Sequence, residues 1–352
     1  MATVNELVMQ AVSRGASDIH LTVGKAPVMR IDGELMEAAE YGRLDPQAAE
    51  ALIRPLVPPD RMGTLETAGD VDFAYAVGGQ RLRVNVFKQR GCFAAALRLL
   101  AQSIPTIDGL RLPPVLKQFA SLRRGLVLVT GPTGSGKSTT LAAMIDYINE
   151  TRSCHIITVE DPIEYVHEHK RCIVNQREVS EDTIAFSSAL RASLREDPDV
   201  ILVGEMRDLD TISAAITAAE TGHLVLSTLH TQGAADTINR IIDVFPANQQ
   251  AQIRTQLAET LAAVITQQLV PVTAAMGGGR VAALEVMART DAIANLVREG
   301  KIFQIDNAIQ TGRQFGMQGM DMALGALVRS RLITPEEALS RCVDPQEIKR
   351  YF

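Results

Sequence analysis

Apolar residues near the start of the chain recur with the period of an α-helix. Over residues 4–12 they fall on one helix face, and Gly15 follows as a stop signal. A second helix is predicted from Asp45 to about Ile53, because three prolines interrupt the chain shortly after it. These are the two helices expected in the first hundred residues.

Between and after these helices, apolar and polar residues alternate with the period of a β-strand. Residues 19–23 and 28–31 predict a hairpin, and the second run leads into a turn at Asp32 and Gly33. Three more runs cover residues 71–77, 82–86 and 93–100. This part of the chain therefore predicts a small α+β domain with a mostly antiparallel sheet.

Beyond about residue 120 the pattern changes to short, almost continuous apolar runs with helical stretches between them. Five runs are predicted as strands: residues 126–130, 155–159, 200–203, 224–228 and 281–286. Runs that are apolar on both faces are typical of strands covered by helices on both sides. This part of the chain therefore predicts a parallel or mixed α/β sheet.

These changes in pattern divide the chain into four predicted parts. Residues 1–100 form the α+β domain, and residues 101–120, which contain three prolines, form a linker. Residues 121–290 form the α/β core. Over residues 291–352, glycines and prolines separate consecutive helices, which predicts a helical C-terminal subdomain.

Composition and charge exclude several classes of protein. Hydrophobic residues make up 46% of the chain and charged residues 22%, which is typical of a globular protein with a full core. The net charge of −6 and the absence of tryptophan argue against a nucleic-acid partner. Proteins that bind nucleic acids usually have a basic surface and aromatic rings on which bases stack. The four cysteines are widely separated, so neither a zinc site nor a disulfide framework is predicted.

The same features bear on where the protein works. Isolated thiols fit a reducing cytosol, and the first residues lack the basic start and apolar core of a signal peptide. No apolar run approaches the roughly 18–20 residues needed to cross a bilayer. We therefore expect a cytoplasmic protein without a transmembrane segment, able to dock against a membrane complex.

The nine residues from 131 to 139 read GPTGSGKST and lie between a predicted strand and a predicted helix. This is the P-loop, or Walker A, pattern, formed here by Gly131, Pro132, Thr133, Gly134, Ser135, Gly136, Lys137, Ser138 and Thr139. Its backbone N–H groups and the positive end of the following helix attract phosphate oxygens. Lys137 is expected to reach the β- and γ-phosphates, and the Ser138 hydroxyl is placed to ligate Mg²⁺. The pattern predicts a nucleoside triphosphate, and the absence of an Asn-Lys-x-Asp sequence disfavours GTP.

Phosphoryl transfer also needs an acid beside the metal ion and a group that orients water. The predicted strand 200–203 ends in a glycine followed by Glu205, which is the Walker B arrangement. A second strand end carries Glu160, Asp161 and Glu164. Ligands collect at the carboxyl ends of strands in open α/β sheets, so these carboxylates are candidates for the site. The alternative for each is an ordinary solvated loop acid.

Two histidines and three arginines are further candidates. His223 and His230 flank a predicted core strand, so at least one is expected at the nucleotide edge; the alternative is a structural histidine. Arg81 and Arg83 share one face of a strand, and Arg98 lies on the next strand. Their guanidinium groups would match a γ-phosphate, but the residues alone favour an ordinary half-exposed sheet face.

The stretch from 131 to 231 closely resembles the secretion-type ATPases that drive type IV pili and type II secretion. Four signatures occur in the family's order: Walker A, the acidic box ITVEDPIEY, the Walker B block REDPDVILVGEMRD and the histidine box TAAETGHLVLSTLHT. Within this family, ASDIHLTVGKAPVMRIDGEL, NQREV, RIIDVFP and AIANLVREGK are similar to the PilT-type retraction ATPases. The extra N-terminal domain and four-cysteine zinc loop usual in extension and secretion ATPases are not expected here.

The resemblance implies a RecA-like P-loop ATPase domain, a smaller PAS-like α+β N-terminal domain and a helical C-terminal tail. It implies hydrolysis of ATP with Mg²⁺, in which Ser138 and Glu205 act on the metal side and Glu164 orients or activates water. His223 and His230 would couple the γ-phosphate to conformation. A non-hydrolysing regulatory ring is disfavoured because both glutamates are present, and the acidic balance disfavours a RecA-type nucleic-acid motor.

The resemblance also assigns Arg83 and Arg98 to the γ-phosphate, which reverses the interpretation from the residues alone; Arg81 receives no role. It implies a homohexameric ring, docked peripherally on an inner-membrane platform protein, that retracts pilin and powers twitching motility. In the helix that the family ties to retraction, this chain has Ala294 in place of arginine and Gly300 in place of the usual aspartate. An auxiliary retraction ATPase, or an extension-type pilus or type II secretion ATPase, is therefore kept as the alternative.

Overall fold

The computed structural model describes residues 3–31, 33–100 and 103–352, and the chain forms two compact units, Met1–Ser103 and Ile104–Phe352. Each unit has an apolar core of its own. Asp32, in the predicted hairpin turn, and residues 101–102, at the start of the predicted linker, lie outside the described residues.

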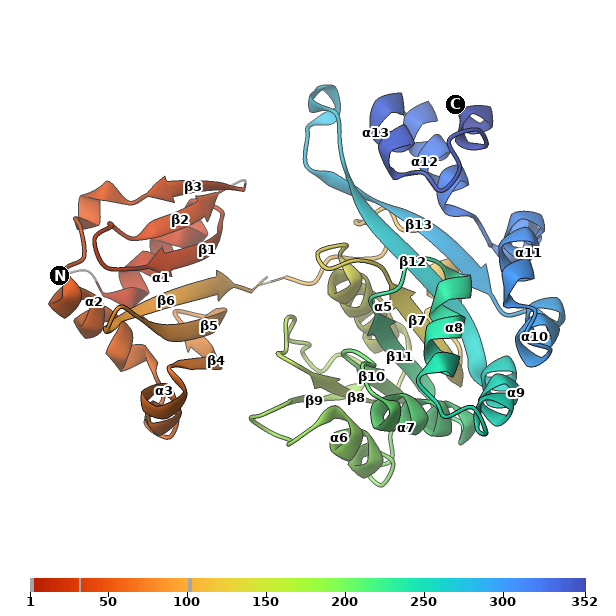
Figure 1. Ribbon diagram of the computed structural model, residues 1–352, viewed down its shortest axis with the longest axis horizontal. Helices are drawn as coiled ribbons and strands as arrows, with labels where there is room; N and C mark the ends of the chain where they lie inside the picture. The colour runs from red at the N-terminus through yellow and green to blue at the C-terminus, as the bar shows by residue number, and fades with distance from the viewer. Residues whose placement is uncertain (1–2, 32, 101–102) are drawn as a thin grey trace. The chain divides into compact units, whose positions relative to one another are not determined.

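In the described residues, the first unit is an antiparallel sheet with strand order β3-β2-β1-β6-β5-β4, together with the α-helices α1 to α3 (Figure 1). The strands are β1 (Ala16–Leu21), β2 (Val28–Ile31), β3 (Glu34–Glu37), β4 (Asp70–Val77), β5 (Gln80–Gln89) and β6 (Cys92–Leu99). The helices are α1 (Val4–Ser13), α2 (Pro46–Ile53) and α3 (Met62–Ala68). The core lies between the helices and one face of the sheet, which leaves the other sheet face polar. The predicted α+β arrangement is confirmed.

The local sequence explains where these elements begin. α1 starts with a capping box, in which the Glu6 backbone N–H donates to Thr3 Oγ1 (3.2 Å) and the Thr3 N–H donates to the Glu6 carboxylate (2.8 Å). The Asp45 side chain caps α2, and Pro46 is its first residue. β3 and α3 carry little sequence signal, because β3 is exposed along its whole length and α3 buries only Leu65.

The second unit contains a mixed sheet with strand order β13-β12-β7-β11-β10-β8-β9. The strands are β7 (Gly125–Thr130), β8 (His155–Glu160), β9 (Ile173–Glu178), β10 (Val200–Val203), β11 (Leu224–Leu229), β12 (Leu261–Pro271) and β13 (Arg280–Ala288). Neighbouring strands are parallel except β12 and β13, which are antiparallel. The carboxyl ends of the parallel strands therefore meet at one edge of the sheet.

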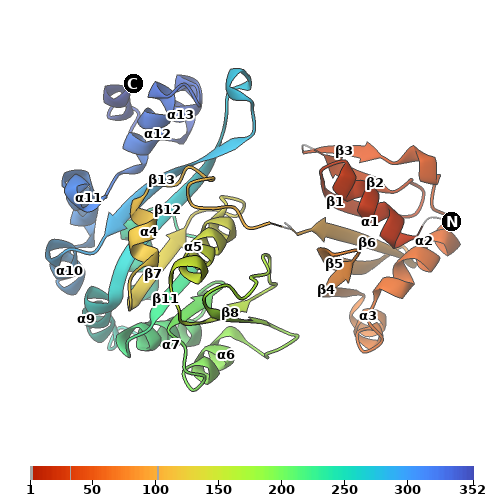
Figure 2. The ribbon, with the colours of Figure 1, turned by 180° about the vertical axis from the view of Figure 1, so that it is seen from behind.

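Helices cover both faces of this sheet. They are α4 (Val115–Ala120), α5 (Lys137–Thr151), α6 (Phe186–Ser193), α7 (Leu209–Glu220), α8 (Ala234–Asp243) and α9 (Gln250–Thr260). Figure 2 shows α4 and α5 in front of the sheet, whereas α8 is in front of it in the opposite view of Figure 1. Their apolar sides join the strands in one large core, as expected for strands buried on both faces.

β12 escapes prediction because three consecutive polar residues, Thr266, Gln267 and Gln268, interrupt its apolar pattern. Thr266 and Gln267 are nevertheless buried. Burial is tolerated because their polar atoms bond to other polar groups, such as the Thr130 hydroxyl at 3.0 Å from that of Thr266. A search for apolar runs alone therefore misses a strand whose buried polar residues bond to one another inside the core.

Helix α4 corrects the predicted linker over residues 101–120. Its apolar side chains are buried in the core of the second unit, which begins at Ile104. Two prolines stand directly before α4, where proline is compatible with the start of a helix. Those prolines therefore mark a helix start and not flexible chain.

The C-terminal helices belong to the second unit. α10 (Asp291–Arg298) and α11 (Ile305–Thr311) pack on its main core, and α12 (Met320–Arg329) and α13 (Pro335–Arg341) form a smaller core with β12 and β13. In the ranges that the structure describes, every helix is too short or too polar to cross a membrane.

The two positions that differ from the retraction family lie on α10 and at its end. Ala294 is only 3% exposed and belongs to the main core of the second unit. Gly300 has a φ of +71°, and the Lys301 N–H donates to the Leu296 carbonyl (2.9 Å). Glycine thus ends α10 in a left-handed conformation that other residues adopt less readily.

Candidate active site

The P-loop connects the end of β7 to the start of α5, as predicted, and Lys137 is the first residue of the helix. Gly131 and Gly136 have φ values of +137° and +87°, in the region that favours glycine. Pro132, Thr133, Gly134 and Ser138 are exposed, whereas Ser135 is buried and its hydroxyl has no hydrogen-bond partner in the described chain. The loop thus offers several donors at the edge where the parallel strands end.

The Lys137 side chain is buried within this loop. Its Nζ donates to the carbonyls of Gly131 (2.9 Å) and Pro132 (3.0 Å). Burial lowers the pKa of Lys137 from its ordinary value, and the nearby carboxylates of Glu205 and Glu164 act in the opposite direction. The fold therefore brings one cation and two carboxylates, from three separate segments, into electrostatic contact.

Glu205 follows β10 and turns its carboxylate toward an arginine and a histidine. Its Oε1 lies 2.6 Å from Arg207 Nε, and its Oε2 lies 3.5 Å from His230 Nε2. The Thr228 hydroxyl donates to the carbonyl of Gly204 (2.6 Å) and fixes the backbone next to Glu205. Because β10 and β11 are parallel and adjacent, Glu205 and His230 reach the same edge of the sheet.

The acidic box after β8 is tied to the P-loop helix. Tyr165 Oη lies 3.0 Å from Thr139 Oγ1, and Glu164 is exposed one residue earlier. Glu160 accepts hydrogen bonds from Thr158 Oγ1 (2.7 Å) and Gln176 Nε2 (3.1 Å). Burial raises the pKa of Glu160 to about 7, so this carboxyl changes charge near neutral pH.

His223 does not join this group. It precedes β11, and its neighbour Leu224 pairs with Gly125 at the beginning of β7, so His223 lies at the opposite edge of the sheet from the P-loop. Six strand residues span on the order of 20 Å. His223 Nδ1 instead lies 2.9 Å from the Ala218 carbonyl, near the end of α7. The expectation that both histidines act at one nucleotide is therefore not met within this chain.

Arg83 and Arg98 occur together on the polar sheet face of the first unit. They are direct cross-strand partners on β5 and β6. Arg98 Nε donates to Asp18 Oδ1 (3.0 Å), and Arg83 Nε lies 3.7 Å from Asp72 Oδ1. The Arg98 side chain is 67% exposed and the Arg83 side chain is 44% exposed, so both ion pairs are open to water. Such ion pairs are weak, and each arginine can leave its aspartate for another anion. Their assignment to a γ-phosphate stays a prediction.

A cavity of about 550 Å³ adjoins the P-loop in the second unit. Gly136 and Thr139 form its wall on the P-loop side, and Leu269 and Gly279 of the β12–β13 hairpin contribute another part. This cavity could not be predicted from the sequence, because its walls come from segments more than a hundred residues apart. It has the size of a small-molecule site.

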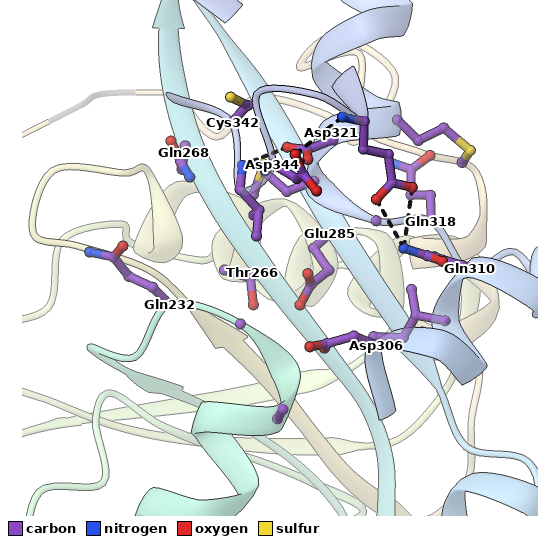
Figure 3. A pocket seen from close by; sticks show the side chains of 18 of the residues that line it. Gln232, Thr266, Gln268, Glu285, Asp306, Gln310, Gln318, Asp321, Cys342 and Asp344 are labelled. Atoms are coloured by element: carbon purple, nitrogen blue, oxygen red, sulfur yellow. Dashed lines mark hydrogen bonds between the residues drawn. The ribbon is translucent and has the colours of Figure 1, made fainter. Parts of the chain in front are cut away.

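A second cavity, of about 480 Å³, lies between the start of α8, the β12–β13 pair and the C-terminal helices (Figure 3). Glu285 and Asp306 both line it. Glu285 Oε1 accepts a hydrogen bond from the Ala234 N–H (2.8 Å) at the start of α8. Across the described ranges there is no group of three or more His, Cys, Asp or Glu that could hold a metal ion.

Glu285 predicts a pH effect on stability. Burial, with Asp306 and Asp236 nearby, raises its pKa from an ordinary 4.5 to about 7. Its stabilising contribution is therefore complete below pH 4.5 and is lost as the pH rises through 7. Glu285→Gln keeps the acceptor for Ala234 and should raise the free energy of unfolding by about 2 kcal/mol at about pH 8.5, with little change at about pH 4.5.

Denaturant unfolding at both pH values measures this effect. The exposed Glu259→Gln on α9 is the matched control and should change stability at neither pH. A gain of equal size at both pH values would contradict the ionisation argument.

Comparison with known proteins identifies the family and supports the fold. A family model described as type II/IV secretion system protein matches residues 1–331. The chain is 50% identical over 344 residues to the type IV pilus retraction ATPase PilT of Pseudomonas aeruginosa, covering 97% of this chain and 99% of that protein. It is 39% identical to the type IV pilus ATPase PilU of the same organism, covering 98% and 90%. A crystal structure of the pilus retraction motor PilT with bound ADP superposes with a TM-score of 0.93 at 50% identity, covering 99% of this chain and all of that one, which confirms the predicted α/β fold.

Proposed function

The chain belongs to the type II/IV secretion system protein family, and we propose that it is an ATPase motor that powers retraction of type IV pili. The full-length likeness to a retraction ATPase supports the cellular role. The observation that carries the chemistry is Lys137 in the P-loop, with the carboxylates of Glu205 and Glu164 near enough to act on its pKa. These side chains supply the positive charge and the carboxylates that hydrolysis of a phosphoanhydride requires.

ATP fits the site in two parts. The phosphates bind the P-loop, where Ser135 carries a buried hydroxyl without a partner in the described chain, and the adenosine occupies the adjoining cavity. The oxygen donors Ser138 and Glu205 suit Mg²⁺, which prefers hydroxyl, carboxylate and phosphate oxygens. When bound, Mg²⁺ would neutralise charge on the phosphate oxygens.

In this proposal, different residues have separate roles in ATP hydrolysis. Lys137 exchanges the two backbone carbonyls it now contacts for γ-phosphate oxygens, which are stronger acceptors because they are charged. Glu164, exposed at the same edge, orients the attacking water and accepts its proton. His230 contacts Glu205 and so senses whether the carboxylate is engaged with the nucleotide. We assign no such role to His223.

Arg83 and Arg98 provide the mechanical coupling in this proposal. ATP draws them to its γ-phosphate, and loss of that phosphate on hydrolysis releases them. The nucleotide thereby biases a conformational equilibrium of the motor through its different affinity for the two states. In a homohexamer, successive opening and closing would turn an inner-membrane platform protein and withdraw pilin. The motor would work in the cytoplasm, docked peripherally at the base of the pilus.

Arg83→Ala should slow hydrolysis more than it weakens ADP binding, because ADP lacks the phosphate that the arginine meets. We expect a loss of about 100-fold in kcat and less than about threefold in the ADP Kd. Steady-state ATPase assays and ADP titrations measure both. Arg81→Ala, on the same face of β5, is the control and should retain kcat. Equal losses in kcat and ADP affinity for Arg83→Ala would show a structural role only.

The cellular role is tested by counting surface pili in cells whose chromosomal copy carries Lys137→Ala. Excess pili with lost twitching motility would establish retraction and show that Ala294 and Gly300 are compatible with it. Bald cells would make the protein an extension motor. Unchanged pili would support the auxiliary alternative or a different secretion-type machine.

A further inference from the structure

Gln267 lies in β12 directly beside the P-loop and is 2% exposed. β12 runs parallel to β7, and Thr266 pairs with Thr130, the residue that precedes the first glycine of the loop. A long polar side chain at this depth needs partners for both its donor and its acceptor. The P-loop and the helix that follows it supply both.

The two ends of the Gln267 amide hold two different parts of the phosphate site. Nε2 donates to the Ser135 carbonyl (2.7 Å), in the loop itself. Oε1 accepts from the Thr140 hydroxyl (2.7 Å), in the first turn of α5. The side chain thus fixes the loop relative to the helix whose amino end faces the phosphates.

Gln267 adds a second reason for two glycines of the Walker pattern, beside their positive φ values. A Cβ at Gly131 would lie 2.3 Å from the Gln267 carbonyl oxygen, and a Cβ at Gly136 would lie 2.8 Å from Gln267 Nε2. Side-chain atoms cannot approach so closely. The loop is therefore pressed against this one residue at both ends.

Leu269, two residues farther along β12, extends the same arrangement. Side chains two residues apart share one face of a strand. Leu269 lines the 550 Å³ cavity and approaches to within 3.6 Å of a Cβ at Gly136, and Gln267 lines the same cavity. One face of β12 thus borders both the phosphate loop and the proposed nucleoside cavity.

We propose that Gln267 is a positioning residue for the nucleotide: it holds the P-loop in its phosphate-binding conformation. It is separate from the Walker motifs and acts through Ser135 and Thr140. This inference rests on the proposed ATPase function. If the amide is removed, the loop must be ordered when nucleotide binds, and the cost of that ordering weakens binding.

The test compares Gln267→Met, which keeps the shape but removes both hydrogen bonds, with Gln268→Met. Gln268 is the next residue on β12, so its side chain points to the opposite face. Titration with fluorescent N-methylanthraniloyl-ADP gives Kd, and ATPase assays give KM and kcat. Gln267→Met should raise the Kd for the ADP analogue about 30-fold, the equivalent of two neutral hydrogen bonds, and raise KM more than it lowers kcat. Gln268→Met should leave all three unchanged.

A purely structural role would give a different result. Gln267→Met would then melt at a lower temperature but bind the ADP analogue with wild-type affinity while folded, and that outcome would overturn the proposal. If Gln267→Met does not fold, Thr140→Val removes only the bond to Oε1, and a Kd raised about fivefold is expected, whereas wild-type affinity would refute the role. Because Kd is measured without turnover, a wild-type chain that binds ADP but fails to hydrolyse ATP would count against the proposed function and not against Gln267.

Discussion

Replacement of Lys137 by alanine is expected to lower kcat for ATP hydrolysis about 1000-fold or more. Lys137 is the buried cation of the P-loop, and its Nζ is held by two loop carbonyls. Its charge offsets the negative charge that builds up on the γ-phosphate in the transition state, and no other side chain of the loop carries a positive charge. The loss should therefore fall mainly on kcat, with a smaller rise in KM.

A phosphate-release assay on the purified variant measures this loss, and circular dichroism checks that the fold is retained. Lys301→Ala is the matched control, because Lys301 is an exposed lysine of the same unit that pairs with Glu299. It should retain wild-type turnover. Wild-type turnover from a folded Lys137→Ala protein would show that the P-loop is not part of the active site.

Glu205→Gln should lower kcat about 100- to 1000-fold while ATP binding is kept. The glutamine is nearly the same size, but it loses the charge that faces Arg207 and His230. The metal side of the site then lacks its carboxylate, whereas the loop that binds the phosphates is unchanged. The variant should therefore trap ATP without hydrolysing it.

Filter binding of ATP, followed by analysis of the bound nucleotide, distinguishes trapping from loss of affinity. Glu220→Gln, on the exposed end of α7, is the matched control and should hydrolyse ATP normally. If Glu205→Gln hydrolyses ATP at the wild-type rate, the carboxylate merely neutralises Arg207 and the Walker B assignment is wrong.

The sequence predicts those parts of the site whose functional residues form short motifs of neighbouring residues. The P-loop, Glu205 and Glu164 each follow an apolar run that forms a strand, and a parallel sheet brings such strand ends to one edge. The same rule places His230 at the edge. It excludes His223, which precedes its strand, and the strand direction was needed to separate the two.

Gln267 could not be predicted in this way. Its partner Ser135 lies 132 positions away, and the apolar run of the strand that carries Gln267 ends at Ile265. α4 escaped for a related reason, since local proline content indicated a linker while distant residues buried the helix. Features made by long-range packing leave no periodic signal in a single sequence.

The close approach of β12 to the P-loop also limits which residues can occupy positions 131 and 136. A side chain at position 131 requires β12 to shift, because the obstructing atom is the backbone oxygen of Gln267 and no replacement at 267 removes it. At position 136 the obstructing atom is a side-chain nitrogen, which a shorter residue at 267 would remove, but the φ of +87° still disfavours any residue with a Cβ. Both positions should therefore hold glycine among homologues, whatever residue occupies position 267. A suppressor screen starting from Gly136→Ala would therefore be expected to recover reversion to glycine more often than changes at position 267.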